Sequence, residues 1–155
     1  PIISKVGRSY IQSEMQRNKA ILGAETSYHF YFKDVFYLDD VIFATLKILE
    51  VLSSSNLRLS DLVKEVPIYH YESKRIPMDD SKKFRFVESL KEELKDYRIE
   101  EIDGIKVWLD DESWICVRAS NTEPKISIAF ESKNPKRFEE LKQIAEKIIE
   151  KAKNF

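Results

Sequence analysis

The feature that most constrains the fold is a series of four β-prone runs with only short polar connections between them. Their sequences are RIEEI, IKVWL, SWICVRA and KISIAFE, and they make up most of residues 98–131. The pair Asp103-Gly104 is typical of a hairpin turn, and DDES from Asp110 indicates a second tight connection. Tight turns join antiparallel strands, whereas parallel strands need a long crossover. This region therefore predicts an antiparallel sheet.

Two helical segments flank these strands. The first covers residues 81–97, and the second begins at Pro135, where Asn134 can cap and proline suits the first helical position. One apolar stripe runs along the second helix, formed by Phe138, Leu141, Ala145, Ile148 and Ala152. With a further strand near residues 68–76, the pattern predicts an α+β domain over residues 73–155, with an antiparallel sheet and two helices on one face.

The first 55 residues follow a different order, strand, helix, strand, helix, which predicts a partial α/β unit. Residues 1–6 look like a short buried strand ending at Gly7, residues 9–18 have helical spacing, and residues 27–32 are aromatic and β-prone. Asp39 and Asp40 can cap a helix over residues 41–54. Residues 56–72 are predicted to be a linker, with a small polar run and a short helical turn that Ser60 could cap.

Composition excludes several classes of protein. The 26 basic and 27 acidic residues balance, so no global field attracts nucleic acid or anionic lipid, and we expect neither partner. No apolar run approaches the roughly 20 residues that span a bilayer, and the start has no signal-peptide core, so a cytoplasmic protein is expected. The single cysteine, Cys116, is expected to be a small buried hydrophobe. Because the chain starts at Pro1, we expect a fragment or a processed chain.

The most polar turn of the chain is RASNTEP, between the last two β-prone runs. Arg118 offers a planar fork of donors that suits a phosphate, and Ser120, Asn121, Thr122 and the backbone N–H groups of the turn could complete an anion cradle. Ser, Asn, Thr and Pro are also ordinary turn formers. Chemistry alone leaves both interpretations open.

A second polar cluster lies in GAETSYHF, residues 23–30. Glu25, Ser27 and His29 alternate, so on an extended segment they would project to one side, where they could bind vicinal sugar hydroxyls. One Glu and one His make a poor metal set, because a zinc site needs three or four ligands. The alternative is a loop with a solvent-facing glutamate and a locally bonded histidine.

A third candidate is the turn SKVGRS, where Lys5 and Arg8 lie on either side of Gly7. Strand-to-helix turns of α/β sheets face the ligand crevice, and the N-terminus of the following helix favours anions. Charged turns are also common on protein surfaces. The other histidine, His70, is assigned no role.

In this order, the three stretches resemble the α-D-phosphohexomutases, the phosphomannomutase and phosphoglucomutase family, over the whole chain. The run SKVGRSYIQSEM…AILGAETSYHFYF is similar to the latter part of the family's third domain, with its K-x-G entry and its G-E-x-S-G-H sugar-binding loop. The run DGIKVW…SWICVRASNTEP is similar to the fourth domain, whose R-x-S-N-T-E-P loop binds the substrate phosphate. Tyr28 stands where the family usually has glycine, and a side chain there could alter the loop backbone or the sugar pocket.

The resemblance implies roles for the candidate residues. The non-reacting phosphate of a sugar phosphate would be held by Arg118, Ser120, Asn121 and Thr122. Sugar hydroxyls would be bound by Glu25 and Ser27, with His29 close to the reacting end, and the turn with Lys5, Gly7 and Arg8 would also face the ligand. The implied activity is interconversion of hexose 1-phosphates and 6-phosphates, of mannose, glucose or both, through a phosphoserine and a bisphosphate intermediate.

The resemblance also implies what other parts of such an enzyme supply. In the family a phosphoserine in the first domain transfers the phosphoryl group, and an aspartate-rich loop in the second holds Mg²⁺, with hexose 1,6-bisphosphate as the intermediate. The acidic pairs of this chain, such as Asp39-Asp40, are better explained as caps and turns, so no metal ligand is expected here. This chain alone is then expected to be inactive, with the N-terminal domains of the same enzyme as partners and a homo-oligomer possible. The alternative is a stand-alone α+β binding or assembly module.

Overall fold

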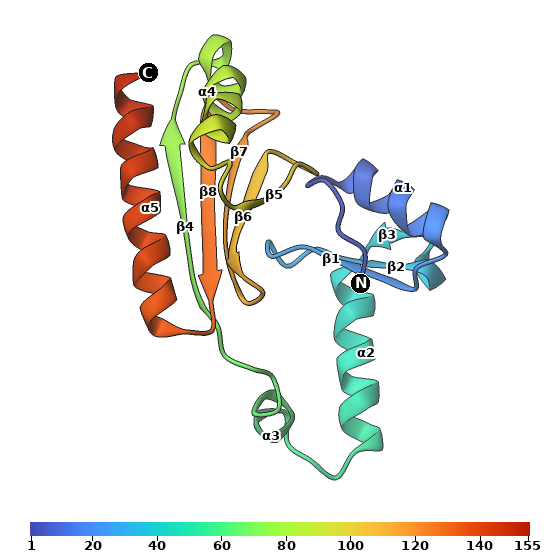
Figure 1. Ribbon diagram of the computed structural model, residues 1–155. Coiled ribbons are helices and arrows are strands. Elements are labelled where there is room, and N and C mark those ends of the chain that lie inside the picture. The colour runs from blue at the N-terminus through green and yellow to red at the C-terminus, as the bar shows by residue number, and fades with distance from the viewer. The chain divides into compact units, whose positions relative to one another are not determined.

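The computed structural model describes all 155 residues, which form two compact units, Pro1–Pro67 and Ile68–Phe155 (Figure 1). Each unit has its own buried cluster of hydrophobic side chains. The segment predicted as a linker, residues 56–72, contains a short helix and the start of a strand. No helix of the chain is both long enough and apolar enough to cross a bilayer.

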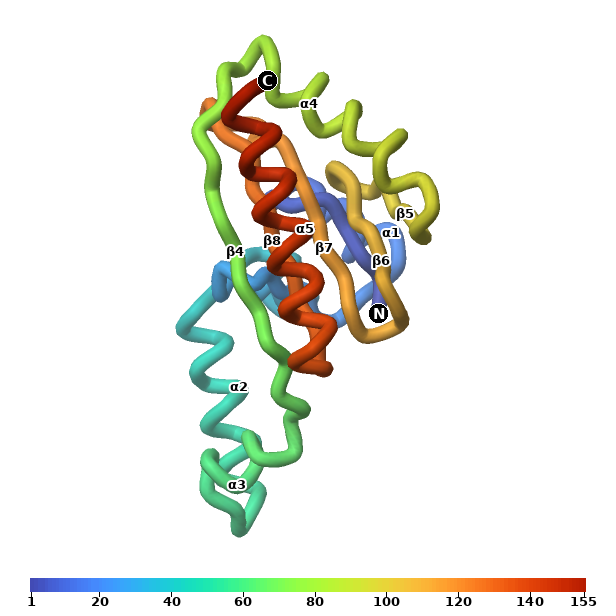
Figure 2. Tube along the Cα trace, turned by 60° about the vertical axis from the view of Figure 1, so that its left-hand side comes forward, coloured from blue at the N-terminus to red at the C-terminus, as the bar shows by residue number.

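The second unit is an antiparallel sheet with two helices on one face. The sheet has the strand order β4-β8-β7-β6-β5, and every neighbouring pair is antiparallel. The bounds are β4 His70–Pro77, α4 Asp80–Glu93, β5 Arg98–Glu100, β6 Ile105–Asp110, β7 Ser113–Ala119, β8 Lys125–Ser132 and α5 Pro135–Asn154. In Figure 2, α5 runs along the sheet beside β8 and β4. The α+β prediction is confirmed, including both tight turns.

Buried and half-buried residues alternate strictly along β7 and β8, and the buried ones form the core of this unit. Ile115 and Val117 of β7 and Ile128 and Phe130 of β8 are buried, whereas the residues between them are only half-buried. Apolar residues of α4 and α5 pack on this same face, among them Leu141. Burying each such side chain stabilises the fold by about 1.5–3 kcal/mol. Asn134 caps α5 as predicted, since its Oδ1 accepts from Lys136 N at 2.9 Å.

The opposite face of the sheet carries aromatic and cationic side chains. The Lys106 ammonium lies 4.1 Å from the ring centroid of Trp108 and 4.3 Å from that of Trp114, within cation–π range. Trp114 donates to Glu131 at 3.3 Å. Cys116, predicted to be a small buried hydrophobe, lies half-buried on this face, and burial raises the pKa of its thiol to about 11.

The first unit contains a three-stranded antiparallel sheet, ordered β1-β2-β3, with helices before and after it. Its buried cluster joins Ile11 and Met15 of the first helix to Tyr31 of the central strand. The bounds are α1 Arg8–Asn18, β1 Leu22–Ala24, β2 Phe30–Phe32, a 3₁₀ turn η1 Lys33–Val35, β3 Leu38–Asp39, α2 Val41–Ser54 and α3 Leu59–Val63. The predicted helices over 9–18 and 41–54 are confirmed.

Three local predictions for this unit are wrong. Residues 1–6 form no strand and are mostly exposed, because β1, β2 and β3 pair only with one another. The strand expected over residues 27–32 covers only Phe30–Phe32, because the residues before Phe30 form a turn. Ser60 does not cap α3: it lies inside the helix, and Arg58 occupies the N-cap position.

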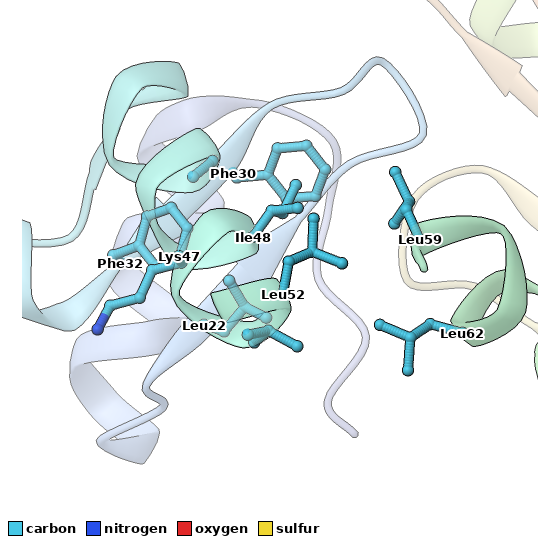
Figure 3. A pocket seen from close by; sticks show the side chains of 10 residues that line it. Leu22, Phe30, Phe32, Lys47, Ile48, Leu52, Leu59 and Leu62 are labelled. Atoms are coloured by element: carbon cyan, nitrogen blue, oxygen red, sulfur yellow. The ribbon is translucent and has the colours of Figure 1, made fainter. Parts of the chain in front are cut away.

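An apolar hollow lies within the first unit, between α2, α3 and the small sheet. Asp40 caps α2 by accepting from Phe43 N at 2.9 Å, and Ala44 is the buried residue of that helix. The hollow has a volume of about 350 Å³, and Figure 3 shows the side chains that surround it. Its lining is Leu22, Phe30, Phe32, Ala44, Lys47, Ile48, Val51, Leu52, Leu59 and Leu62. It lacks the convergent polar groups that orient a polar ligand.

Candidate functional site

The turn between β7 and β8 is held together by its own hydrogen bonds. Ser120 is buried, and its N–H donates to Lys125 O at 3.0 Å. The Ser120 hydroxyl oxygen accepts from the backbone N–H groups of Thr122 at 3.4 Å and Glu123 at 3.2 Å. Two of the N–H groups expected to face an anion are therefore already bonded inside the turn. Ser120, which is only 5% exposed, therefore builds the turn.

Arg118 and Asn121 from this turn line one hollow of the second unit. The hollow has a volume of about 270 Å³ and is bordered by α4, by the connection from β5 to β6, and by the end of β7. Arg118 is about three-quarters buried, and its Nη1 lies 3.7 Å from Asp103 Oδ2. At 3.7 Å this is an ion pair longer than a hydrogen bond, so the orientation of the guanidinium is limited mainly by the burial of the side chain. Thr122 is exposed beside them.

Gly104 brings the β5–β6 connection against the strand that carries Arg118. Its φ is +81°, and a Cβ built there would lie 2.3 Å from Val117 O and 2.9 Å from Arg118 Cα. Only glycine allows so close a backbone approach at positive φ. The sequence pattern identified this residue as a hairpin signal but gave no indication of its contact with the site.

The charges around the hollow leave Arg118 as its principal cation. The other basic side chain in the lining, Lys91, pairs with Glu88 at 2.8 Å and with Glu101 at 2.7 Å, and these hydrogen bonds, the one donated to Glu101 first, raise its pKa. Arg118 faces one carboxylate, that of Asp103 at 3.7 Å, whereas Lys91 is paired with two, so Arg118 is the less neutralised of the two cations in a lining that also holds three carboxylates.

Lys83 also supports the turn, although no motif pointed to it. Its side chain is almost fully buried, donates to Glu123 O at 3.1 Å, and pairs with Asp80 at 2.6 Å. The partner lies 40 residues away in sequence, so no local pattern could have found this contact. Met78 N adds a bond to Pro124 O at 3.0 Å.

In the first unit, GAETSYHF forms the tight turn of a hairpin between β1 and β2. Glu25 N donates to His29 O at 3.0 Å and Tyr28 N donates to Glu25 O at 3.0 Å, so the segment reverses direction. The expectation that Glu25, Ser27 and His29 project to one side of an extended segment is therefore wrong. Ser27 and His29 are exposed on the turn, whereas the Glu25 carboxylate is half-buried and turns inward.

The Glu25 carboxylate connects this turn with SKVGRS. Its Oε1 accepts from Gly7 N at 3.3 Å, and its Oε2 accepts from the Tyr31 hydroxyl at 2.8 Å. Gly7 begins α1, with φ at 125°. The positive charge of Arg8 acts to lower the pKa of Tyr31. The Lys5 ammonium lies 5.8 Å from the Tyr10 ring centroid. Two of the three candidate stretches thus meet within one unit.

His29 is hydrogen-bonded to Asp39, with 2.5 Å between Nδ1 and Oδ2. The other carboxylate oxygen accepts from Phe30 N at 3.0 Å. Burial acts to raise the pKa of Asp39, but the hydrogen bonds from His29 and from the Phe30 N–H outweigh it, and the pKa is lowered. The prediction that Asp39 caps α2 is wrong, because Asp40 alone does so. The sequence does not indicate which of the adjacent residues Asp39 and Asp40 caps the helix and which one bonds across the sheet.

Tyr28 adopts the left-handed backbone region, with φ at 66°, and its side chain is 83% exposed. This is the position at which the resembling family usually has glycine, and positive φ is what glycine tolerates. A non-glycine residue there costs roughly 1–2 kcal/mol. The side chain points to solvent, and the backbone keeps a conformation that suits glycine, so the effect of Tyr28 is a cost in backbone strain.

Tyr31 should titrate well above an ordinary tyrosine. Burial, the hydrogen bond to Glu25, and the charges of Glu25 and Asp39 together raise its pKa from 10.0 to about 12. The folded state therefore holds this proton more tightly than the unfolded state, so the associated stability is complete below pH 10 and is lost between pH 10 and 12. Ultraviolet titration of tyrosinate should show a phenol ionising near pH 12 that is missing in Tyr31→Phe and unchanged in Tyr28→Phe. Identical curves for Tyr31→Phe and the parent chain would contradict this assignment.

No group of three or more His, Cys, Asp or Glu side chains in the chain is arranged as metal ligands. The Glu25 region supplies one imidazole and two carboxylates, but each carboxylate already accepts two hydrogen bonds from the protein. These residues do not fit a metal.

Two family models match the chain. Residues 1–69 match the model described as phosphoglucomutase/phosphomannomutase, alpha/beta/alpha domain III, and residues 74–151 match the phosphoglucomutase/phosphomannomutase C-terminal domain. A crystal structure of a phosphoglucomutase/phosphomannomutase family protein from Burkholderia thailandensis aligns with a TM-score of 0.82 at 24% identity, covering 99% of this chain and 33% of that one. A likeness at that identity shows the fold.

Curated relatives match at higher identity. A probable phosphoglucosamine mutase of Methanococcoides burtonii is 37% identical over 99% of this chain and 34% of its own length. A phosphomannomutase of Methanocaldococcus jannaschii is 33% identical over 95% of this chain and 33% of its own length. A phosphoglucomutase/phosphomannomutase of Thermococcus kodakarensis is 32% identical over 96% of this chain and 33% of its own length. The chain spans about a third of the length of these relatives.

Proposed function

Because the chain belongs to the phosphoglucomutase/phosphomannomutase family, we propose that it is the C-terminal portion of an enzyme that interconverts hexose 1-phosphates and 6-phosphates. Phosphoryl transfer proceeds through a phosphoserine and a bisphosphate intermediate. Relatives named for glucosamine, mannose and glucose phosphates support hexose phosphates as the substrate class in this proposal. The part played by this portion is recognition of the sugar and of its non-reacting phosphate.

The observation that carries the proposal is the hollow beside the β7–β8 turn. Arg118 supplies a mostly buried guanidinium there, and Asn121 supplies an amide from the same turn. Ser120 and Thr122 are assigned to the same phosphate because they belong to the same turn as Asn121, although neither lines the hollow. A phosphate dianion has three strong acceptor oxygens, and charge-assisted bonds from an arginine fork are the strongest that a neutral-pH site provides. This turn therefore binds the phosphate that does not react.

The sugar end of the proposal rests on the first unit. Ser27 and His29 are exposed on the turn between β1 and β2, and the Glu25 carboxylate lies behind them. A carboxylate has about four lone-pair sites, so Glu25 can accept from a sugar hydroxyl while it keeps its bonds to Gly7 and Tyr31. His29 lies near the reacting end. The turn with Lys5 and Arg8 faces the ligand and adds positive charge.

The phosphoryl chemistry itself belongs to other domains of the same enzyme, which are the proposed partners of this chain. Phosphoryl transfer depends on positioning and on neutralising the charge of the moving group, which in this proposal a phosphoserine and Mg²⁺ provide. The residues described here contribute binding and orientation, so the chain alone is inactive. Hexose 1,6-bisphosphate is the intermediate, the enzyme acts in the cytoplasm, and self-association is compatible with the proposal.

Titration of the isotope-labelled chain with glucose 6-phosphate tests the proposal. We expect backbone amide shifts to change in residues 118–123, with smaller changes for inorganic phosphate and none there for glucose. The reason is that the turn recognises the phosphate group and gains affinity from the attached sugar. If glucose 6-phosphate leaves these resonances unmoved, the phosphate-binding assignment is wrong, and a stand-alone α+β binding module becomes the better interpretation.

A further inference from the structure

We propose that Asp39 is a positioning residue that holds neutral His29 in the tautomer protonated at Nδ1, so that Nε2 faces solvent as a hydrogen-bond acceptor. When the ring is neutral, the site takes a hydroxyl donor at this point rather than an anion. The proposal rests on the function given above only for the identity of the ligand, a sugar hydroxyl. The tautomer itself is a property of this chain and can be measured without any ligand.

Asp39 is well fixed in the hairpin. It ends β3 and pairs with Tyr31 of β2 across the sheet. One oxygen, Oδ1, accepts from Phe30 N at 3.0 Å, which leaves Oδ2 directed at the His29 ring at 2.5 Å from Nδ1. The Asp39 side chain is only 16% exposed, whereas the His29 side chain is 50% exposed. The carboxylate is thus anchored inside the sheet while the imidazole extends outward.

This contact determines where the imidazole proton resides. An ionised carboxylate can only accept, so the nitrogen facing it must carry hydrogen. A neutral imidazole has one N–H, and when it is fixed at Nδ1 the lone pair is left on Nε2. The lowered pKa of Asp39 keeps that carboxylate ionised at neutral pH. The other charged or titratable groups nearby are Arg8, whose charge reaches both Asp39 and Tyr31, and Glu25, which Tyr31 bonds.

The consequence for a ligand follows from lone-pair geometry. A sugar hydroxyl can donate to an unprotonated Nε2, whereas a phosphate oxygen, which offers only lone pairs, cannot bond to it. His29 in this state therefore favours the hydroxyl side of a sugar phosphate. The same turn has Ser27 exposed close by in sequence, and its hydroxyl can both donate and accept. Asp39 acts through the ring, because its own side chain is only 16% exposed.

Nitrogen-15 spectroscopy of the imidazole rings tests this inference directly. The chain has two histidines, and His70 serves as an internal reference because its ring packs 5.5 Å from the Phe138 ring centroid and makes no hydrogen bond to a carboxylate. At a pH where the ring shifts no longer change, we expect His29 to show the Nδ1–H pattern. His70 should show the Nε2–H preference of a free imidazole or a mixture.

Asp39→Asn should reverse the tautomer at His29. The Phe30 N–H keeps the amide oxygen in the place of Oδ1, so the new NH₂ group occupies the place of Oδ2 and donates to Nδ1. We expect the ratio of the two tautomers to change by more than about tenfold, since a hydrogen bond to a charged group contributes about 1.5–3 kcal/mol. The shifts of His70 should stay the same in this variant.

Two results would overturn the inference. One is an Nε2–H tautomer for His29 in the unmodified chain, and this measurement does not depend on any variant folding. The other is a folded Asp39→Asn variant whose His29 keeps its Nδ1 proton. Neither result depends on sugar-phosphate binding, so a failed glucose 6-phosphate titration would leave this inference intact, and a wrong tautomer would leave the phosphate site intact.

Discussion

Replacing Arg118 by alanine should weaken the binding of glucose 6-phosphate to this chain by about 10- to 100-fold. The structure shows a mostly buried guanidinium at the end of β7 that lines the hollow with Asn121. Charge-assisted hydrogen bonds to a phosphate contribute about 1.5–3 kcal/mol, and each 1.4 kcal/mol is tenfold in affinity. Isothermal titration calorimetry or the amide shifts of residues 118–123 would measure the loss.

Two further variants sharpen this test. Arg118→Lys keeps the charge but loses the planar fork, so its affinity should fall between those of the parent chain and Arg118→Ala. Arg137→Ala removes one positive charge from α5, where Arg137 pairs with Asp110 and Glu140, at the opposite end of β7 from Arg118. It should bind as the parent chain does. Equal affinities for Arg118→Ala and Arg137→Ala would mean that net charge, and not this site, governs binding.

Replacing Gly104 by alanine should lower the free energy of unfolding of the second unit by about 2–4 kcal/mol. The left-handed backbone alone costs roughly 1–2 kcal/mol for a residue with a Cβ. The Cβ would also lie 2.3 Å from Val117 O, so β6 and β7 must separate where Ile105 pairs with Val117. Such overlap belongs to the few mechanisms that give large effects. Because Arg118 follows Val117 directly, binding should weaken as well.

Both tryptophans, Trp108 and Trp114, lie in the second unit, so their fluorescence during urea unfolding reports this unit alone. Gly104→Asn separates the cost of the positive φ from the cost of the steric overlap. Asparagine tolerates a positive φ better than alanine does but has the same Cβ, so the Gly104→Asn variant should be nearly as unstable as Gly104→Ala. Glu112→Ala, in the exposed turn between β6 and β7, should stay within about 0.5 kcal/mol of the parent chain. A Gly104→Ala variant as stable as Glu112→Ala would contradict the steric argument.

Most of the second unit could be predicted from the sequence because its signals are local. Alternation in β7 and β8, the Asp103-Gly104 turn and the Asn134 cap each involve residues that are close together in the chain. The first unit was less predictable. Its strands have two or three residues, which is too short for a period-two pattern to show, and the apolar run at residues 1–6 has β character but pairs with no strand here.

The candidate site divides in the same way. The polar turn after Arg118 is contiguous, so its chemistry could be read directly, although the internal role of Ser120 could not. Asp39, Tyr31 and Lys83 reach their partners across a sheet or from another helix, at separations of 10, 6 and 40 residues. No local pattern encodes such contacts. Adjacent Asp39 and Asp40 illustrate the point, because one caps a helix and the other orients a histidine.

The turn between β7 and β8 has a kinetic consequence. The Ser120 hydroxyl oxygen accepts from the backbone N–H groups of Thr122 and Glu123 in this turn. The Lys83 ammonium donates to the carbonyl of Glu123, and the Met78 N–H donates to the carbonyl of Pro124. The conformational entropy of this loop is therefore lost when the unit folds and not when a ligand arrives. The loop is preorganised before a phosphate arrives, so binding should require little rearrangement of the loop backbone. Differences in affinity among related sugar phosphates are then expected to appear mainly as differences in how slowly each one leaves.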